Sequence, residues 1–136
     1  MSSDIAAADL TQGAGQVRRE SEEQLALLQT ITQEIATAPD LSSALKIVTR
    51  DVCEKTGWTV GMAWLPNEER TLLRCDSVWT GSNDAVADFR AASETSQFKR
   101  GIGLPGRVWK SKQPIWIEDV TNDPNFPRSG AAGIAG

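Results

Sequence analysis

The sequence predicts an α+β fold in which an antiparallel sheet has helical segments on both faces. Two amphipathic helical patterns come first, over residues 18–38 and 41–56. Two strand patterns follow, over residues 58–66 and 71–80, and the Pro-Asn-Glu-Glu turn between them is short enough for a hairpin. A glycine-rich crossover, residues 100–109, then precedes another strand pattern. We expect the first two helices on one face of the sheet and the crossover segments on the other.

The N-terminal part combines an expected leader with an amphipathic helix. Residues 1–17 are small and polar, with glycines at positions 13 and 15, so they predict a flexible leader. The helix of residues 18–38 contains the capping-box spacing of Ser21–Gln24 and ends before Pro39. Its apolar stripe consists of Leu25, Leu28, Ile31 and Ile35. This stripe either packs on its own domain or pairs with its copy in a second chain, because it spans too few heptads to prove a coiled coil.

The second helix and the hairpin have clear boundary signals. Asp40 is a good N-cap, and Gly57 supplies the left-handed conformation that ends a helix. The strand of residues 58–66 is apolar on both faces, which is typical of a central strand covered on both sides. The strand of residues 71–80 alternates more cleanly between apolar and polar side chains, so it is expected to be the more exposed of the two.

The second half of the chain is less regular. A short helix is expected over residues 84–93, followed by Phe98, the glycine crossover and a strand over residues 115–120. The loop after this strand contains Pro124 and Pro127 and is too rich in proline to be regular.

The three crossover glycines, Gly101, Gly103 and Gly106, also spell the G-x-G-x-x-G pattern of dinucleotide-binding loops. That motif follows a hydrophobic strand and opens a long helix. Here the preceding strand is weak and polar, and Gln113-Pro114 stops the following turn after a few residues. The context therefore disfavours a nucleotide-binding enzyme.

Composition excludes several classes of function. The 136 residues carry a formal net charge of −4 with dispersed basic residues, so we expect no nucleic-acid partner. No histidine is present, which excludes histidine-based catalysis and zinc sites built on imidazole. The chain has neither an export signal nor an apolar run near the ~20 residues of a membrane span, which predicts a cytoplasmic location without membrane insertion. Cys53 and Cys75 are expected to be free, partly buried thiols, and a disulfide or redox role is unsupported.

Three segments of the second half carry a family resemblance: Gly101–Trp109, the Pro114–Val120 return, and the loop Asn122-Asp123-Pro124-Asn125-Phe126. Together they resemble the GAF family of small-molecule sensory domains, and the likeness extends from about Leu25 to the C-terminus. GAF-like domains continue through a short helix into two more strands beside the first strand, and this sequence has no such segment. We therefore expect an incomplete domain, or a second chain that supplies the missing sheet edge.

The resemblance implies a ligand pocket between one face of the sheet and the crossover segments. The residues at matching positions are Trp79, Phe89, Phe98, Ile102, Leu104, Trp109, Trp116, Asp119, Phe126 and Arg128. Aromatic walls would suit a flat or apolar ligand, and Arg128 would hold a ligand carboxylate or phosphate. The alternatives are ordinary core packing for each tryptophan, a turn cap for Asp119 and a solvated side chain for Arg128.

The resemblance also implies a non-catalytic sensory module that gives input to a longer signalling protein such as a sensor kinase. Pocket occupancy would shift the helix of residues 18–38 between two arrangements in a homodimer. The missing histidine disfavours bilin and haem, so neither a cofactor nor a metal is expected. Leu104-Pro105 stand where family members that reduce methionine sulfoxide carry a cysteine. The alternatives are a structural dimerisation domain without a ligand and, behind it, a thiol-dependent oxidoreductase.

Overall fold

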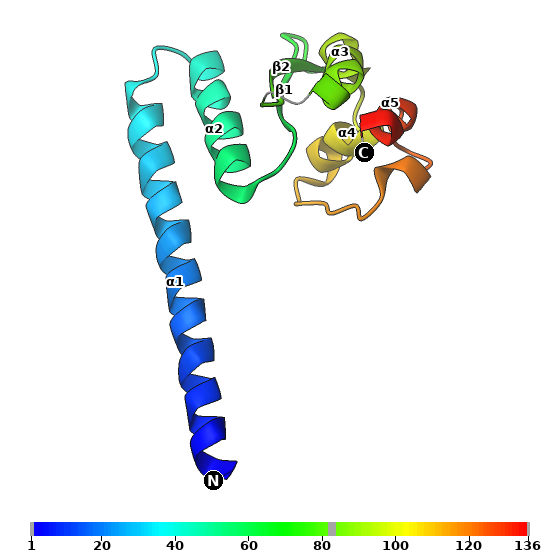
Figure 1. Cartoon of the computed structure of the whole chain (residues 1–136). Coiled ribbons are helices and arrows are strands. Elements are labelled where there is room, and N and C mark those ends of the chain that lie inside the picture. Colours follow the sequence, from blue (N-terminus) through cyan, green and yellow to red (C-terminus); the bar gives the residue numbers. More distant parts are fainter. Residues whose placement is uncertain (1, 82–83, 136) are drawn as a thin grey trace.

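The computed structural model describes residues 2–81 and 84–135 of the chain. Figure 1 shows a long helix packed beside a second helix, with a small sheet and several short helices beyond them. In chain order the elements are α1 (Ser2–Thr37), α2 (Leu41–Thr56), β1 (Gly61–Pro66), β2 (Leu73–Trp79), η1 (Asp84–Val86), α3 (Ala87–Thr95), β3 (Gln97–Phe98), α4 (Gly103–Ser111), η2 (Val120–Asn122) and α5 (Ser129–Ala135). This architecture confirms the predicted α+β class.

The sheet is antiparallel throughout its described strands, in the order β1-β2-β3. A bulge interrupts the hairpin, because Ala63 pairs with Ser77 whereas the next residue, Trp64, pairs with Cys75. Asp76 is therefore the extra residue on β2. Dinucleotide-binding loops occur in parallel strand–helix units. Because this sheet is antiparallel, the glycine crossover does not have the structural context of such a loop.

Helix α2 covers one face of the hairpin and contacts both β1 and β2. Gly61 permits this close approach, since an added Cβ would lie 2.5 Å from Sγ of Cys53 and 3.1 Å from the carbonyl oxygen of Thr49. Ser42 Oγ donates a hydrogen bond to the carboxylate of Asp76 at 3.0 Å, which ties the start of α2 to the bulge. The predicted caps of α2 are confirmed, since Asp40 accepts from the Ser43 N–H and Gly57 is left-handed.

Helices α3, α4 and α5 lie on the other face. Helix α3 contacts β2 and α5, and α4 contacts β3. Three buried apolar side chains hold this layer to the sheet, namely Val86, Phe98 and Phe126. The predicted helix of residues 84–93 forms as η1 followed by α3.

Helix α1 begins at Ser2, so the structure continues the helix through the part of the expected leader that it describes. Residues 6–8 are three consecutive alanines, the strongest helix formers, and the two glycines of this segment are tolerated within a long helix. Helix α1 contacts α2 near its C-terminal end and projects beyond the rest of the chain (Figure 1). Among the described residues, no helix has the combination of length and hydropathy that crossing a membrane requires.

Three strand and helix predictions need correction. The strand expected over residues 115–120 does not form, because no described strand lies beside it to complete its hydrogen bonds, and Trp116 is 79% exposed. The first strand starts at Gly61, and among the described strands it is an edge strand with one neighbour. Helix α5 lies in the segment after Pro127, where glycines at positions 130 and 133 weaken the helical signal of the sequence.

Candidate ligand-binding cavity

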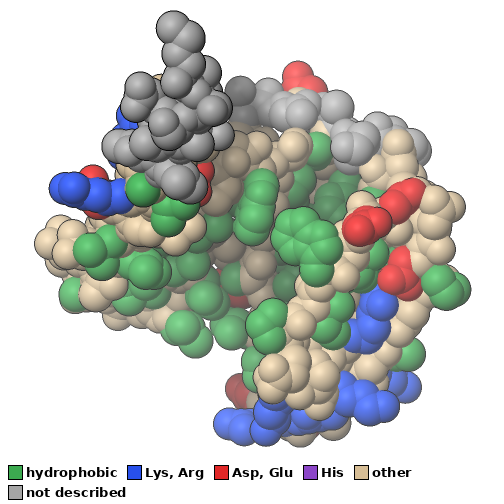
Figure 2. Space-filling model, turned by 90° about the horizontal axis from the view of Figure 1, so that it is seen from below, with side chains coloured by type: hydrophobic (Ala, Val, Ile, Leu, Met, Phe, Trp, Pro, Cys, Tyr) green, Lys and Arg blue, Asp and Glu red, His purple; other side chains and the backbone are tan. Residues whose placement is uncertain are grey.

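A cavity of about 740 Å³ lies between the sheet and the layer formed by α3, α4 and α5. This volume is in the range of small-molecule pockets. Figure 2 shows apolar side chains gathered around a hollow on the face of the molecule seen from below Figure 1. The walls are predominantly apolar and include Val60, Met62, Trp64, Leu73, Val86, Phe89, Leu104, Val108, Trp109, Val120, Phe126, Arg128 and Ala132.

Local structure explains which side chains reach the cavity. Alternate residues of β1 point to one face of the sheet, so Met62 and Trp64 line the cavity while Ala63 is buried on the side of α2. Helix α4 contributes Leu104 and Val108, which are four residues apart and therefore lie on the same helical face. The cavity is thus built between a strand face and a helix face.

Arg128 is the charged residue in the cavity wall, and its side chain is almost fully buried at 7% exposure. Its Nη1 donates to Ser93 Oγ at 2.7 Å and to Met62 Sδ at 3.3 Å. Four aromatic rings surround the guanidinium carbon at centroid distances between 4.9 and 5.2 Å. We call these rings the aromatic cage: Trp64, Phe89, Phe98 and Phe126.

The guanidinium of Arg128 is incompletely satisfied. Its Nε is buried and has no hydrogen-bond partner, and none of the ion pairs within the described residues includes Arg128. Burial lowers the pKa of Arg128 to about 10, and the side chain is therefore still charged at neutral pH. The cavity consequently combines apolar walls with one buried positive charge that has no ion-pair partner among the described residues.

The glycine crossover positions α4 at the cavity. The side chain of Asn125 accepts from the Gly103 N–H at 3.0 Å and donates to the Gly101 carbonyl at 2.9 Å. Arg107 donates to the carboxylate of Asp123 at 2.9 Å and to the Asn125 carbonyl at 3.2 Å. This network joins the crossover to the loop that carries Phe126 and Arg128, so both walls of the cavity are fixed to each other.

The structure brings together five of the residues that the resemblance placed at the pocket: Phe89, Leu104, Trp109, Phe126 and Arg128. Phe98 lies behind the wall, buried, with its ring 5.0 Å from that of Trp64. The alternative of a solvated Arg128 is wrong, since that side chain is buried.

Four other expected pocket residues do not line the cavity. Ile102 is 47% exposed, and the exposed Trp116 lies in the irregular segment after α4. Trp79 ends β2 and lies against the backbone of Gly81. Asp119 caps η2, where hydrogen bonds from the side chain and backbone of Thr121 lower its carboxyl pKa. These positions follow the sequence likeness but point away from the cavity or lie outside it.

Sequence reasoning missed several wall residues, among them Met62, Trp64 and Val108. The alternation of the first strand already placed Met62 and Trp64 on one face, but did not show which layer covers that face. Ser93, which accepts a hydrogen bond from Nη1 of Arg128, belongs to no recognisable sequence motif.

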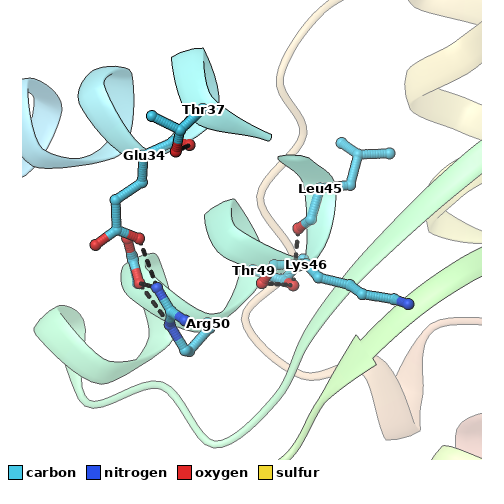
Figure 3. Close-up of polar contacts among 7 residues, drawn as sticks. Glu34, Thr37, Leu45, Lys46, Thr49 and Arg50 are labelled. Carbon is cyan, nitrogen blue, oxygen red and sulfur yellow. Dashed lines mark hydrogen bonds and ion pairs between the residues drawn. The ribbon is translucent and has the colours of Figure 1, made fainter. Parts of the chain in front are cut away.

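The expected dimer helix has one buried and three exposed apolar positions. Ile31 is buried against α2 at 9% exposure, whereas Leu25, Leu28 and Ile35 are 56%, 62% and 37% exposed. Arg50 of α2 connects the two helices, because it pairs with Glu34 of α1 at 2.6 Å (Figure 3). It also pairs with its buried neighbour Asp51 at 2.7 Å.

Both cysteines are free, and burial raises the pKa of the Cys53 and Cys75 thiols, which keeps them protonated at neutral pH. No group of three or more metal-ligating side chains lies together within residues 2–81 and 84–135.

Comparison with known proteins identifies the family. The sequence model of the GAF domain matches residues 38–136. A GAF domain from a phosphoenolpyruvate-protein phosphotransferase of Coxiella burnetii is 26% identical with a TM-score of 0.63, and one from the Acinetobacter phosphoenolpyruvate-protein phosphotransferase is 21% identical with a TM-score of 0.60. The matches cover 80% and 76% of this chain, and the chain spans only 62% and 61% of those structures. No curated protein gives a significant sequence match. The family match over most of the sequence shows that this chain belongs to the GAF domain family of regulatory modules.

Proposed function

We propose that this GAF domain is a non-catalytic sensory input module that binds a small molecule in the cavity beneath α4. The observation that carries the proposal is the cavity itself, which joins about 740 Å³ of largely apolar space to one buried, charged side chain, Arg128. Such a combination favours a ligand that fits by shape and is oriented by a polar contact.

A continuous set of contacts leads from the cavity to α1. Met62 and Trp64 form part of the cavity wall, and the opposite face of the same strand packs on α2 through Gly61. Helix α2 in turn holds α1 through Ile31 and the Arg50–Glu34 ion pair. A ligand that favours one position of β1 would thereby favour one position of α1, provided that it binds the two arrangements with different affinity.

We further propose that α1 forms a homodimer. The exposed stripe of Leu25, Leu28 and Ile35 lies on a helix that projects beyond the rest of the chain (Figure 1). Pairing of two copies would bury this stripe. The dimer would carry the signal to a downstream output domain.

The solved neighbours suggest the kind of output domain that we propose for this chain. Both solved neighbours are GAF domains of phosphoenolpyruvate-protein phosphotransferases, which are enzymes of phosphoryl transfer. We propose that this domain likewise gives input to a longer cytoplasmic signalling protein such as a kinase. The free thiols of Cys53 and Cys75 suit a reducing compartment.

Native mass spectrometry of the protein purified from its own host tests the ligand proposal. We expect an added mass of a few hundred daltons that is released on denaturation. Leu104→Trp fills the cavity and should abolish this mass. Ile102→Trp adds the same bulk at an exposed position outside the cavity and should retain it.

The competing function is a structural dimerisation domain without a ligand. It predicts no added mass in the native protein and no difference between Leu104→Trp and Ile102→Trp. That result, obtained with folded proteins, would leave dimerisation through α1 as the better account.

A further inference from the structure

The chemistry of the cavity restricts the kind of molecule that it binds. Arg128 is buried at 7% exposure, Nη1 is used by Ser93, and Nε has no hydrogen-bond partner. Within the described residues no carboxylate lies within ion-pair distance of this guanidinium. A buried cation without a counter-ion is unfavourable, because it loses its hydration and gains no opposite charge.

The aromatic cage compensates this loss only in part. Ring faces attract a cation, but they cannot accept the N–H of Nε as an oxygen atom does. Ser93 is an equally incomplete partner, since it is a neutral hydroxyl that also donates to the carbonyl of Phe89 at 2.6 Å. The site therefore lacks an anionic acceptor, and the cavity beside it is large enough to admit one.

We propose that the ligand is an anion with a flat apolar body, whose carboxylate or other oxyanion group pairs with Arg128. The anionic group pairs with the guanidinium from the side that lines the cavity, and it supplies the missing negative charge. The apolar body lies in the cavity against Trp64, Phe89 and Leu104. This inference rests on the proposed function, since it names the ligand class for the same cavity.

Two fluorescent probes that differ by one sulfonate group test this inference. 8-Anilinonaphthalene-1-sulfonate carries an oxyanion, and N-phenyl-1-naphthylamine has the same ring system without it. The wild-type domain should bind the anionic probe at least about tenfold more tightly, as a hydrogen-bonded charge pair requires. Arg128→Gln should bring the two affinities to about the same value. Arg90→Gln, which removes an exposed arginine on α3, should keep the wild-type preference.

A measurement on the wild-type protein alone keeps the inference testable if Arg128→Gln does not fold. Naphthalene-2-carboxylate should displace the anionic probe at about one tenth of the concentration that the neutral naphthalene-2-carboxamide needs. Arg128→Lys keeps the charge and should retain part of the preference. Near-ultraviolet circular dichroism verifies native packing in each variant.

The outcomes separate this inference from the proposed function. Equal binding of both probes to the wild type, or an unchanged preference in folded Arg128→Gln, would overturn the anionic ligand while the cavity remains a binding site. Failure of the wild type to bind either probe would overturn the binding function together with the inference.

Discussion

Arg128 carries its charge in an apolar environment, and this should lower the stability of the free protein. Its folded-state pKa is reduced to about 10 by burial, so the charged form is penalised at every pH below that value, and the penalty declines only as the pH rises through 10. Arg128→Met keeps an unbranched apolar side chain, although a shorter one, and removes the charge. Ser93 Oγ retains its bond to the Phe89 carbonyl in this variant.

We therefore expect Arg128→Met to raise the free energy of unfolding by about 1 to 2 kcal/mol at neutral pH, measured by urea unfolding without ligand. The same variant should lose binding of anionic probes, so stability and binding change in opposite directions. A decrease of stability comparable to that of a core deletion would instead show that Arg128 is a structural residue held by the aromatic cage.

Gly106 allows the crossover to fold back on itself. Its carbonyl accepts from the Gly101 N–H at 2.7 Å, and an added Cβ would overlap the carbonyl oxygen of Lys99. Because that neighbour is backbone, the clash is not relieved by a side-chain rotation. Gly106→Ala should lower the free energy of unfolding by about 2 to 3 kcal/mol.

The matched control for Gly106→Ala is Gly13→Ala in α1, where nothing lies within 4 Å of the added methyl group. Alanine is favoured over glycine in a helix, so this control should be neutral or stabilising by up to about 1 kcal/mol. Thermal unfolding of both variants measures the change in the free energy of unfolding. Equal changes at the two positions would contradict the close packing of the crossover.

At the scale of elements, the apolar stripe of α1 should have two separable functions. One is packing on α2, and the other is self-association. Ile31 is buried on α2, whereas Leu28 is 62% exposed. Ile31→Ala should reduce the free energy of unfolding of the monomer by about 2 kcal/mol. Leu28→Ala should change it by less than about 0.5 kcal/mol and should instead weaken self-association.

Sedimentation equilibrium of the two variants, with unfolding measured at concentrations below the dimer dissociation constant, separates these effects. A wild-type domain that stays monomeric at high concentration, or a Leu28→Ala variant that dimerises normally, would argue against pairing through the exposed stripe. The exposed stripe would then not be the interface of a homodimer.

The sequence predicted those elements whose signals are local. Asp40 and Gly57 marked both ends of α2, and the short turn between two strand patterns predicted the hairpin. The prediction of a strand over residues 115–120 was wrong, because a strand needs a neighbouring strand for its hydrogen bonds and no local sequence pattern shows whether one is present. Helix α5 was missed for the opposite reason, since packing against α3 and η2 stabilises a segment whose glycines disfavour a helix.

The cavity was predictable only through the family resemblance. The resemblance put Phe89, Leu104 and Arg128 at a pocket, and all three side chains lie in the wall of this cavity. The burial of Arg128, its unpartnered Nε and its bond to Ser93 depend on residues 35 positions apart in the chain. No spacing rule connects such residues, and only the folded chain shows the charge without a partner.

At the scale of the whole molecule, a sensory role requires that ligand binding in the cavity change the conformation or dynamics of α1. Hydrogen–deuterium exchange tests this most directly, by comparing the protein as purified from its host with the same protein refolded after removal of small molecules. We predict that removal increases exchange at α4 beside the cavity and also changes it at the α1–α2 contact around Ile31. Equal exchange of α1 and α2 in the two samples, with a change confined to the cavity, would contradict a sensory role.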